Sequence, residues 1–199
     1  MDRPGLMQLV KGELSGQEIA SFNPASTRLI VLTWPDSAIT TQAAAWIWNH
    51  WKKSPQNVLF HFQKGFYDVI RCIVIEKYCL SAPKEIDTFV FMDRDMRPDQ
   101  AADPMLVTQG DVIGCQYPTG NDRAWAHPQT IHMGLVKVSR KVIEALDAER
   151  SLDGAPYPMF FFPREAKNRK LGSCECMYFA RRAVKAGFTV GRAGWCGHK

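Results

Sequence analysis

A short apolar run that ends in two carboxylates constrains the fold of this chain more than any other feature. Residues 88–92, Thr-Phe-Val-Phe-Met, have the β-branched and aromatic composition of a buried strand. Asp93 and Asp95 follow directly, and Pro98 opposes any continuation of the strand. Side chains two residues apart on a strand point the same way, so the pattern predicts a buried strand with two acidic groups at its carboxyl end.

Two carboxylates held together repel each other and are costly to remove from water. A hard cation such as Mg²⁺ or Mn²⁺ relieves both problems and keeps coordination positions open for a diphosphate. A polar turn that closes the strand explains the same two residues, because Asp-x-Asp is a common tripeptide. From the residues alone, Asp93 and Asp95 are therefore either metal ligands or turn residues.

The composition is that of one globular domain. The chain has 199 residues, 46% of them hydrophobic and 23% charged, which is enough for a substantial core. No apolar stretch approaches the roughly 18 residues of a membrane span, so none is expected. The six cysteines are scattered and the N-terminal residues show no basic-then-apolar signal segment. We therefore expect reduced thiols and a cytoplasmic location.

The positive charge is concentrated near the C-terminus. The whole chain carries +5, whereas residues 164–199 alone contain nine Lys or Arg against two acids, Glu165 and Glu175. Such a segment favours an anionic ligand, with phosphate the obvious candidate. A solvated basic surface accounts for the same charges equally well.

Strand patterns alternate with helical patterns along the chain. The predicted strands cover about residues 28–32, 57–62, 88–92, 111–117, 130–138 and 188–191, and the predicted helices about 36–53, 66–80, 104–109, 139–149 and 173–187. This alternation is typical of an α/β domain with a mostly parallel sheet, whose sites lie at the carboxyl ends of the strands. We interpret residues 1–27 as an N-terminal arm and 28–199 as the domain.

Four separate segments share one resemblance. They are Leu32-Thr33-Trp34-Pro35 after the first strand, Gly65 to Arg71 in the second helix, Phe89 to Pro98 with its Asp-x-Asp, and Ser173 to Phe188 with its Glu, aromatic, Arg and Ala-Gly-Phe residues. In this order and spacing they resemble small, family-two-like glycosyltransferases of the GT-A fold over about residues 28–198. The resemblance implies a single GT-A-like (Rossmann-like) domain with a mostly parallel central sheet flanked by helices.

The resemblance also implies roles for individual residues. Asp95, Asp93 and His198 would hold Mn²⁺ or Mg²⁺, which bridges the diphosphate of a sugar nucleotide. The residues implied in binding the nucleotide donor are Thr33, Trp34, Pro35, Arg71, Asp93 and Arg94. The expected partners are a UDP- or GDP-linked sugar, an unidentified acceptor and further copies of the chain as a homo-oligomer. No nucleic acid is expected.

One departure from the family pattern concerns the catalytic base. Where inverting relatives carry Asp after Glu in the late helix, this chain has Cys176. A thiol is a poor base near neutral pH because its reference pKa is about 8.5. Glu175 remains as the candidate catalytic residue, near a helix N-terminus where the dipole favours its ionised form.

Three alternatives remain open at this stage. A nucleotidyltransferase usually has a glycine-rich loop after the first strand, which residues 33–37 lack. A zinc-stabilised module could use Cys174, Cys176, Cys196 and His198, although two thiols two residues apart on a helix are about 200° apart around its axis. The third is a GT-A-like domain that binds a nucleotide without turnover, which Cys176 makes credible.

Overall fold

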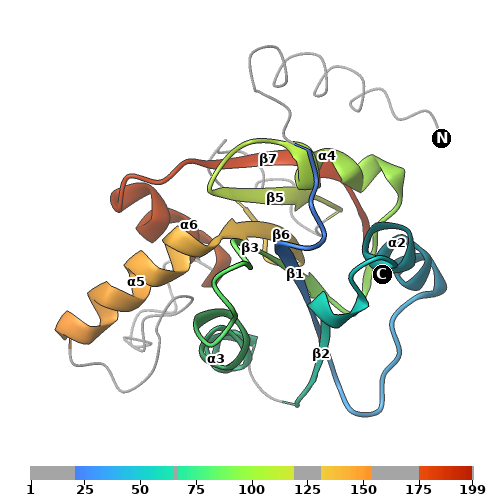
Figure 1. Cartoon of the computed structure of the whole chain (residues 1–199), viewed down its shortest axis with the longest axis horizontal. Helices are drawn as coiled ribbons and strands as arrows, with labels where there is room; N and C mark the ends of the chain where they lie inside the picture. Colours follow the sequence, from blue (N-terminus) through green and yellow to red (C-terminus); the bar gives the residue numbers. More distant parts are fainter. Residues whose placement is uncertain (1–20, 65–66, 119–130, 154–174, 199) are drawn as a thin grey trace.

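The computed structural model describes residues 21–64, 67–118, 131–153 and 175–198. A six-stranded sheet with the order β2-β1-β3-β6-β5-β7 runs through this part of the chain (Figure 1). Its strands are β1 (Thr27–Thr33), β2 (Val58–Phe62), β3 (Thr88–Asp93), β5 (Val112–Gln116), β6 (Leu135–Ser139) and β7 (Val190–Trp195). β6 is antiparallel to both of its neighbours, and the other strands are parallel to one another.

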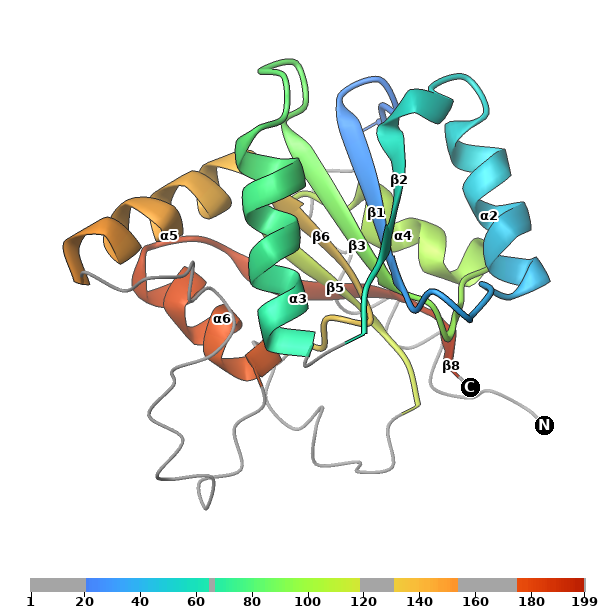
Figure 2. The same ribbon diagram turned by 90° about the horizontal axis from the view of Figure 1, so that it is seen from below.

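Helices cover both faces of the sheet (Figure 2). One face carries α3 (Tyr67–Val74), its continuation as the π-helix η2 (Ile75–Leu80), α5 (Arg140–Asp153) and α6 (Glu175–Lys185). The other face carries α2 (Thr41–Trp51) and α4 (Asp103–Val107), with the 3-10 turns η1 (Pro55–Asn57) and η3 (Gln100–Ala102) nearby in sequence. The predicted fold class, an α/β domain with a mostly parallel sheet flanked by helices, is confirmed.

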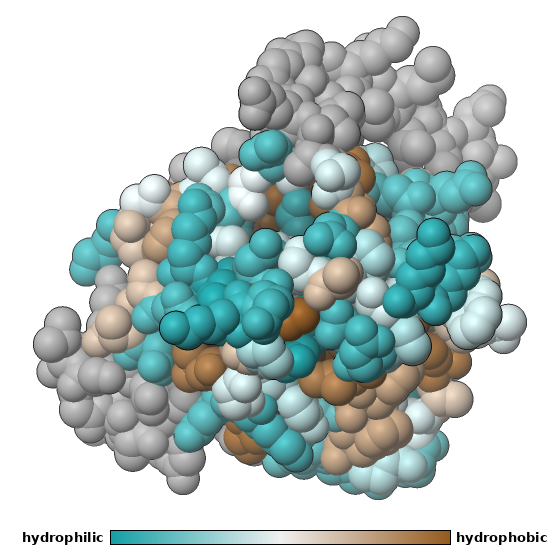
Figure 3. All heavy atoms as spheres, in the orientation of Figure 1, coloured by the Kyte–Doolittle hydropathy of each residue, from teal (hydrophilic) through white to brown (hydrophobic). Residues whose placement is uncertain are grey.

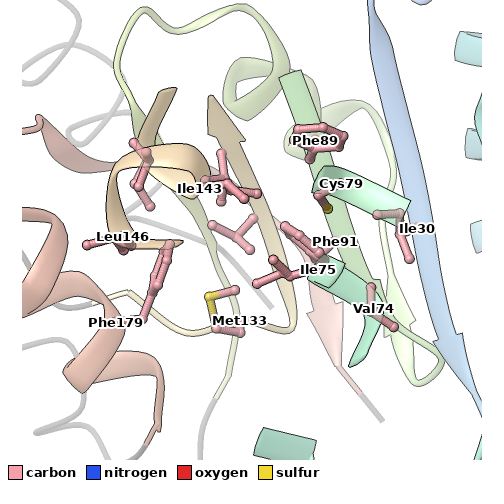
Figure 4. Close-up of a cluster of buried hydrophobic side chains, with 14 of the residues drawn as sticks. Ile30, Val74, Ile75, Cys79, Phe89, Phe91, Met133, Ile143, Leu146 and Phe179 are labelled. Atoms are coloured by element: carbon pink, nitrogen blue, oxygen red, sulfur yellow. The ribbon is translucent and has the colours of Figure 1, made fainter. Parts of the chain in front are cut away.

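The strands supply one residue to each face in turn, and this alternation divides the core into two clusters. Phe89 and Phe91 of β3 pack with Ile30 under α3 and α5, as Figure 4 shows. Val90 and Met92 of the same strand pack on the opposite face with residues of α2 and α4. Both faces of β3 are therefore buried, which explains its uninterrupted apolar sequence.

Several predicted boundaries were wrong. α2 begins at Thr41, not near residue 36, because Thr40 caps it by accepting a hydrogen bond from Ala43 N at 3.1 Å. β6 begins at Leu135, five residues later than predicted. The last strand of the six-stranded sheet, β7, continues to Trp195, four residues beyond the predicted end.

A second, two-stranded sheet was not predicted. β4 (Met96–Arg97) follows β3 closely and pairs antiparallel with β8 (Gly197–His198), which follows β7. The pairing places His198 opposite Met96. It therefore joins the end of the chain to the segment that contains the Asp-x-Asp motif.

The surface mixes polar and apolar side chains. On the face in Figure 3, hydrophobic side chains occur in groups between polar ones. Among the residues that the structure describes, the large exposed hydrophobic side chains are Trp48 on α2 and the stacked pair Phe60 and Phe62 on β2, an edge strand of the sheet. Among the helices of the described residues, none combines the length and the apolar character needed to cross a membrane.

Candidate functional site

The candidate site lies where β1 and β3 end side by side. In the sheet, Leu32 of β1 is the register partner of Asp93, the last residue of β3. The amide of Arg94 then donates a hydrogen bond to Leu32 O at 3.0 Å. The segments after these two strands therefore meet at the carboxyl edge of the sheet, the edge at which open α/β folds bind ligands.

The loop after β1 brings three of the predicted donor-binding residues together. The buried hydroxyl of Thr33 donates to Ser37 O at 3.2 Å, and Ser37 N donates to Trp34 O at 3.0 Å, so the loop is a closed turn. The Arg94 guanidinium lies 4.0 Å from the centroid of the Trp34 ring and donates to Ser37 Oγ at 2.7 Å. Pro35 is exposed beside them. The turn thus presents a tryptophan with a cation already stacked on it.

Arg71 and Asp93 form a buried ion pair. Nη2 of Arg71, on α3, donates to both carboxylate oxygens of Asp93, at 3.0 and 2.8 Å. Arg71 is 2% exposed and Asp93 16% exposed. The cation on Arg71 offsets the charge of Asp93, so the repulsion between the two carboxylates of the motif is already reduced without a metal. The prediction that Asp93 and Asp95 share a cation therefore loses the support of charge repulsion.

Asp95 faces a different partner. Its Oδ2 lies 3.5 Å from Nε2 of His198, and each side chain is about one-third exposed, 33% for Asp95 and 34% for His198. The β4–β8 ladder holds the two residues together, because it starts immediately after Asp95 and ends at His198. The structure therefore places Asp95 beside His198, the two residues that the resemblance assigns to the metal together with Asp93, while Asp93 is turned toward Arg71.

Tyr117, which follows β5, links the two parts of the site. Its ring contacts two histidines, with centroid distances of 5.2 Å to His198 and 5.9 Å to His132. Its hydroxyl accepts a hydrogen bond from Gly134 N at 3.2 Å, and Gly134 O accepts one from Asp93 N at 2.7 Å. Burial raises the pKa of Tyr117 well above its usual value, so the phenol stays neutral.

The side chains of Asp95 and His198 suit a divalent cation that is also coordinated by the phosphate groups of a bound nucleotide. Asp95 offers oxygen and His198 nitrogen, and Mn²⁺ accepts both. Within the described ranges, no group of three or more His, Cys, Asp or Glu side chains is arranged to hold a metal. Mg²⁺ and Mn²⁺ often bind through one or two protein groups together with phosphate oxygens and water. The pair fits this kind of site better than a cage made by the protein alone.

The late helix contributes differently from what the family pattern suggests. Glu175 is the first residue of α6, but its side chain lies outside the described part of the structure. The neighbouring Cys176 is buried, and its Sγ accepts a hydrogen bond from Met133 N at 3.3 Å. Cys176 is thus a core residue.

The same positions argue against the zinc alternative. Cys176 packs in the core cluster under α3, α5 and α6, whereas Cys196 packs in the cluster on the opposite face of the sheet. One tetrahedral ion could not bind both thiols. The remaining candidate, Cys174, lies outside the described residues.

Three residues of the site escaped the sequence analysis. Ser37 falls within the predicted helix of about residues 36–53, yet it precedes α2 and accepts the hydrogen bond of Arg94. Tyr117 was assigned to a strand and given no role, and Gly134 was not singled out. A Cβ on Gly134 would lie 2.7 Å from Tyr117 Oη and 2.8 Å from Met96 Sδ. This close approach was the one signal available, and it appears only once β5 and β6 are paired.

No family model matches the chain, and no curated protein matches it. Among solved structures, the crystal structure of A197 from STIV is similar to this chain, with a TM-score of 0.47 and 12% sequence identity. The match covers 85% of this chain and 83% of that chain. The geometry of the site therefore carries the functional argument.

Proposed function

We propose that the protein is a metal-dependent glycosyltransferase that moves a sugar from a nucleoside-diphosphate sugar to an acceptor. The observation that carries this proposal is the Asp95–His198 pair at the carboxyl edge of a mostly parallel sheet. Asp95 lies next in sequence to Arg94, which stacks on Trp34 in the turn after β1. A carboxylate and an imidazole can coordinate a cation that accompanies a diphosphate, and an arginine nearby can bind a phosphate. Together they suit a bound molecule that combines a diphosphate with an aromatic base.

Each part of the site has a role in this proposal. Asp95 and His198 would hold Mn²⁺ or Mg²⁺, and the cation would supply Lewis-acid stabilisation of the charge on the leaving nucleoside diphosphate. The turn of Thr33, Trp34 and Pro35 forms the wall for the nucleoside. Arg94 stands over this wall with its charge available to a phosphate. The buried Arg71–Asp93 pair fixes the end of β3 and the direction of the segment that follows it.

The base that activates the acceptor is assigned to Glu175, because the buried Cys176 is engaged with Met133 N. This same observation favours a second candidate function, a domain that binds the sugar nucleotide without transferring the sugar. Turnover distinguishes the two candidates, since both require nucleotide binding and only the enzyme hydrolyses or transfers the donor.

Several finer expectations remain part of the proposal. The nucleotide is UDP or GDP, the acceptor is not identified, and the location is cytoplasmic. For the expected homo-oligomer, the stacked Phe60 and Phe62 on β2 are exposed apolar side chains that a second copy could cover.

Titration calorimetry with UDP and GDP, in Mn²⁺ and in excess chelator, tests the proposal. We expect one of the two nucleotides to bind at least about tenfold more tightly with Mn²⁺, because a cation held by Asp95 and His198 would attract the charged diphosphate. The matched monophosphate, UMP or GMP, should gain much less from the metal. Equal affinity with and without Mn²⁺ for both diphosphates would contradict the proposal. Slow hydrolysis of the matching sugar nucleotide would identify the enzyme, and binding without hydrolysis or transfer would favour the second candidate.

A further inference from the structure

Tyr117 makes contacts that no role assigned so far explains. It is buried at the carboxyl end of β5, two strands away from β3 in the sheet. Its ring meets the His198 ring at 5.2 Å with an interplanar angle of 39°. Its hydroxyl accepts the Gly134 amide, whose carbonyl holds the amide of Asp93. One side chain thus contacts a proposed metal ligand and, through one residue, the acidic motif.

The imidazole of His198 needs such a contact to be held in place. His198 belongs to a two-residue strand, and its side chain is about one-third exposed. The 3.5 Å separation from Asp95 is too long for a strong hydrogen bond, so that contact alone does not fix the ring. The Tyr117 ring, which packs in the core, lies against the imidazole with the centroids 5.2 Å apart.

The hydroxyl end of Tyr117 packs closely against the backbone of Gly134. The hydroxyl approaches the backbone so closely at residue 134 that a Cβ there would lie 2.7 Å from Oη. Glycine is therefore required for the tyrosine to occupy this place. The second imidazole, His132, borders the ring at 5.9 Å.

We propose that Tyr117 is a positioning residue that orients the His198 imidazole toward Asp95 for binding of the divalent cation. The inference rests on the proposed function, because it assumes that this pair binds the metal. The two ends of Tyr117 have separate effects. The ring orients His198, and the hydroxyl supports the Gly134 backbone.

This division predicts different results for two substitutions. Tyr117→Phe keeps the ring, so the affinity for Mn²⁺ should stay within about twofold of the parent. Tyr117→Met keeps much of the volume but removes the ring, and the affinity should fall about tenfold, as for other groups that orient a metal ligand. Tyr78→Met is the matched control, because the Tyr78 ring meets the His61 ring edge-to-face at 5.7 Å but neither residue belongs to the proposed metal pair.

Three measurements test the inference. Calorimetry gives the Mn²⁺ affinity of each variant, and pulsed EPR of bound Mn²⁺ reports the ¹⁴N coupling of a coordinated imidazole. The coupling should persist in the parent, Tyr117→Phe and Tyr78→Met, and weaken in Tyr117→Met. In the metal-free parent, NMR should show a nuclear Overhauser contact between the Tyr117 and His198 rings. This measurement uses the parent protein alone and does not depend on the folding of any variant.

The outcomes separate this inference from the proposed function. A parent that binds no Mn²⁺, with or without a nucleoside diphosphate, would overturn both. A parent that binds Mn²⁺ with ¹⁴N coupling, together with a Tyr117→Met variant of unchanged affinity and coupling, would overturn the inference alone. Absence of the Tyr117–His198 contact in the NMR spectra would overturn it as well.

Discussion

Asp111 and Asp95 lie at opposite ends of the sheet and differ in how fully their carboxylates are used. Asp111, just before β5, accepts hydrogen bonds from Thr189 N and Thr189 Oγ1, both at 2.9 Å, and pairs with Lys141 Nζ at 2.6 Å. Asp95, just after β3, has one contact among the described residues, the 3.5 Å approach to His198. Asp111 thus makes three polar contacts with its surroundings, and Asp95 makes one within the described part of the chain.

The difference separates a structural carboxylate from one that is available to a ligand. A carboxylate has about four lone-pair positions. The three contacts of Asp111 connect the residue before β5 with Thr189, just before β7, and with Lys141 on α5. Burial raises its pKa, but the bonds from Lys141 and Thr189 outweigh that effect and hold the pKa below its usual value. Asp95 keeps most of its acceptor positions for water, a cation or a phosphate-bound metal.

The largest expected effect extends the comparison to a third carboxylate, Glu175. If Glu175 is the general base, Glu175→Gln should lower turnover of a sugar nucleotide by about 10²-fold or more, because the amide cannot accept the proton. Cys176→Ser should have a mild effect, and Cys176→Asp should not raise turnover, because it places a carboxylate in the core. Steady-state kinetics on the three variants measures this. Loss of turnover in Cys176→Ser but not in Glu175→Gln would mean that the base assignment is wrong.

The next effect concerns stability. Asp111→Asn should lower the free energy of unfolding by about 2 kcal/mol at pH 7, because it weakens hydrogen bonds to a charged group. The pKa of Asp111 is lower in the folded than in the unfolded chain. Its contribution is therefore complete above the unfolded value of about 3.9 and is lost as the pH falls through the folded value. Denaturant unfolding at several pH values should show parent and variant converging in acid, and a constant difference down to pH 2 would contradict this.

The smallest of the three effects concerns β8. Removal of residues 197–199 should weaken Mn²⁺-dependent nucleotide binding about tenfold, because it deletes His198 and its ladder with β4. The thermal midpoint should change little, since a two-residue exposed strand contributes few core contacts. His198→Ala in the intact chain is the matched control and should reproduce the loss of binding. Unchanged binding in both variants would remove His198 from the site.

The sequence predicts those parts of the fold that have a local pattern. The buried strand before Asp93 is recognisable because five consecutive residues are β-branched, aromatic or apolar. The ladder between β4 and β8 is not, because each strand has two residues and the partners Met96 and His198 are about a hundred positions apart. Pairing at that distance depends on the course of β3 and β7, and no periodic signal records it.

The site follows the same division. The family resemblance implies that Asp95 and His198 hold one metal, and in the structure the two side chains lie 3.5 Å apart. The sequence also assigns Arg71 and Asp93 to the site, but it does not show that they pair with each other. The sequence does not reveal Tyr117, because its contact with the backbone of Gly134 joins residues 17 positions apart. Most of the chain between them has no strand or helix pattern.

A comparison of Asp95→Asn with Asp111→Asn tests the central claim most directly. For each variant, calorimetry would measure how much Mn²⁺ enhances nucleoside diphosphate binding, and thermal unfolding would measure stability. The account predicts that Asp95→Asn loses the enhancement and keeps its thermal midpoint, whereas Asp111→Asn keeps the enhancement and unfolds at a lower temperature. Full Mn²⁺ enhancement in Asp95→Asn would contradict the claim that this carboxylate binds the cation.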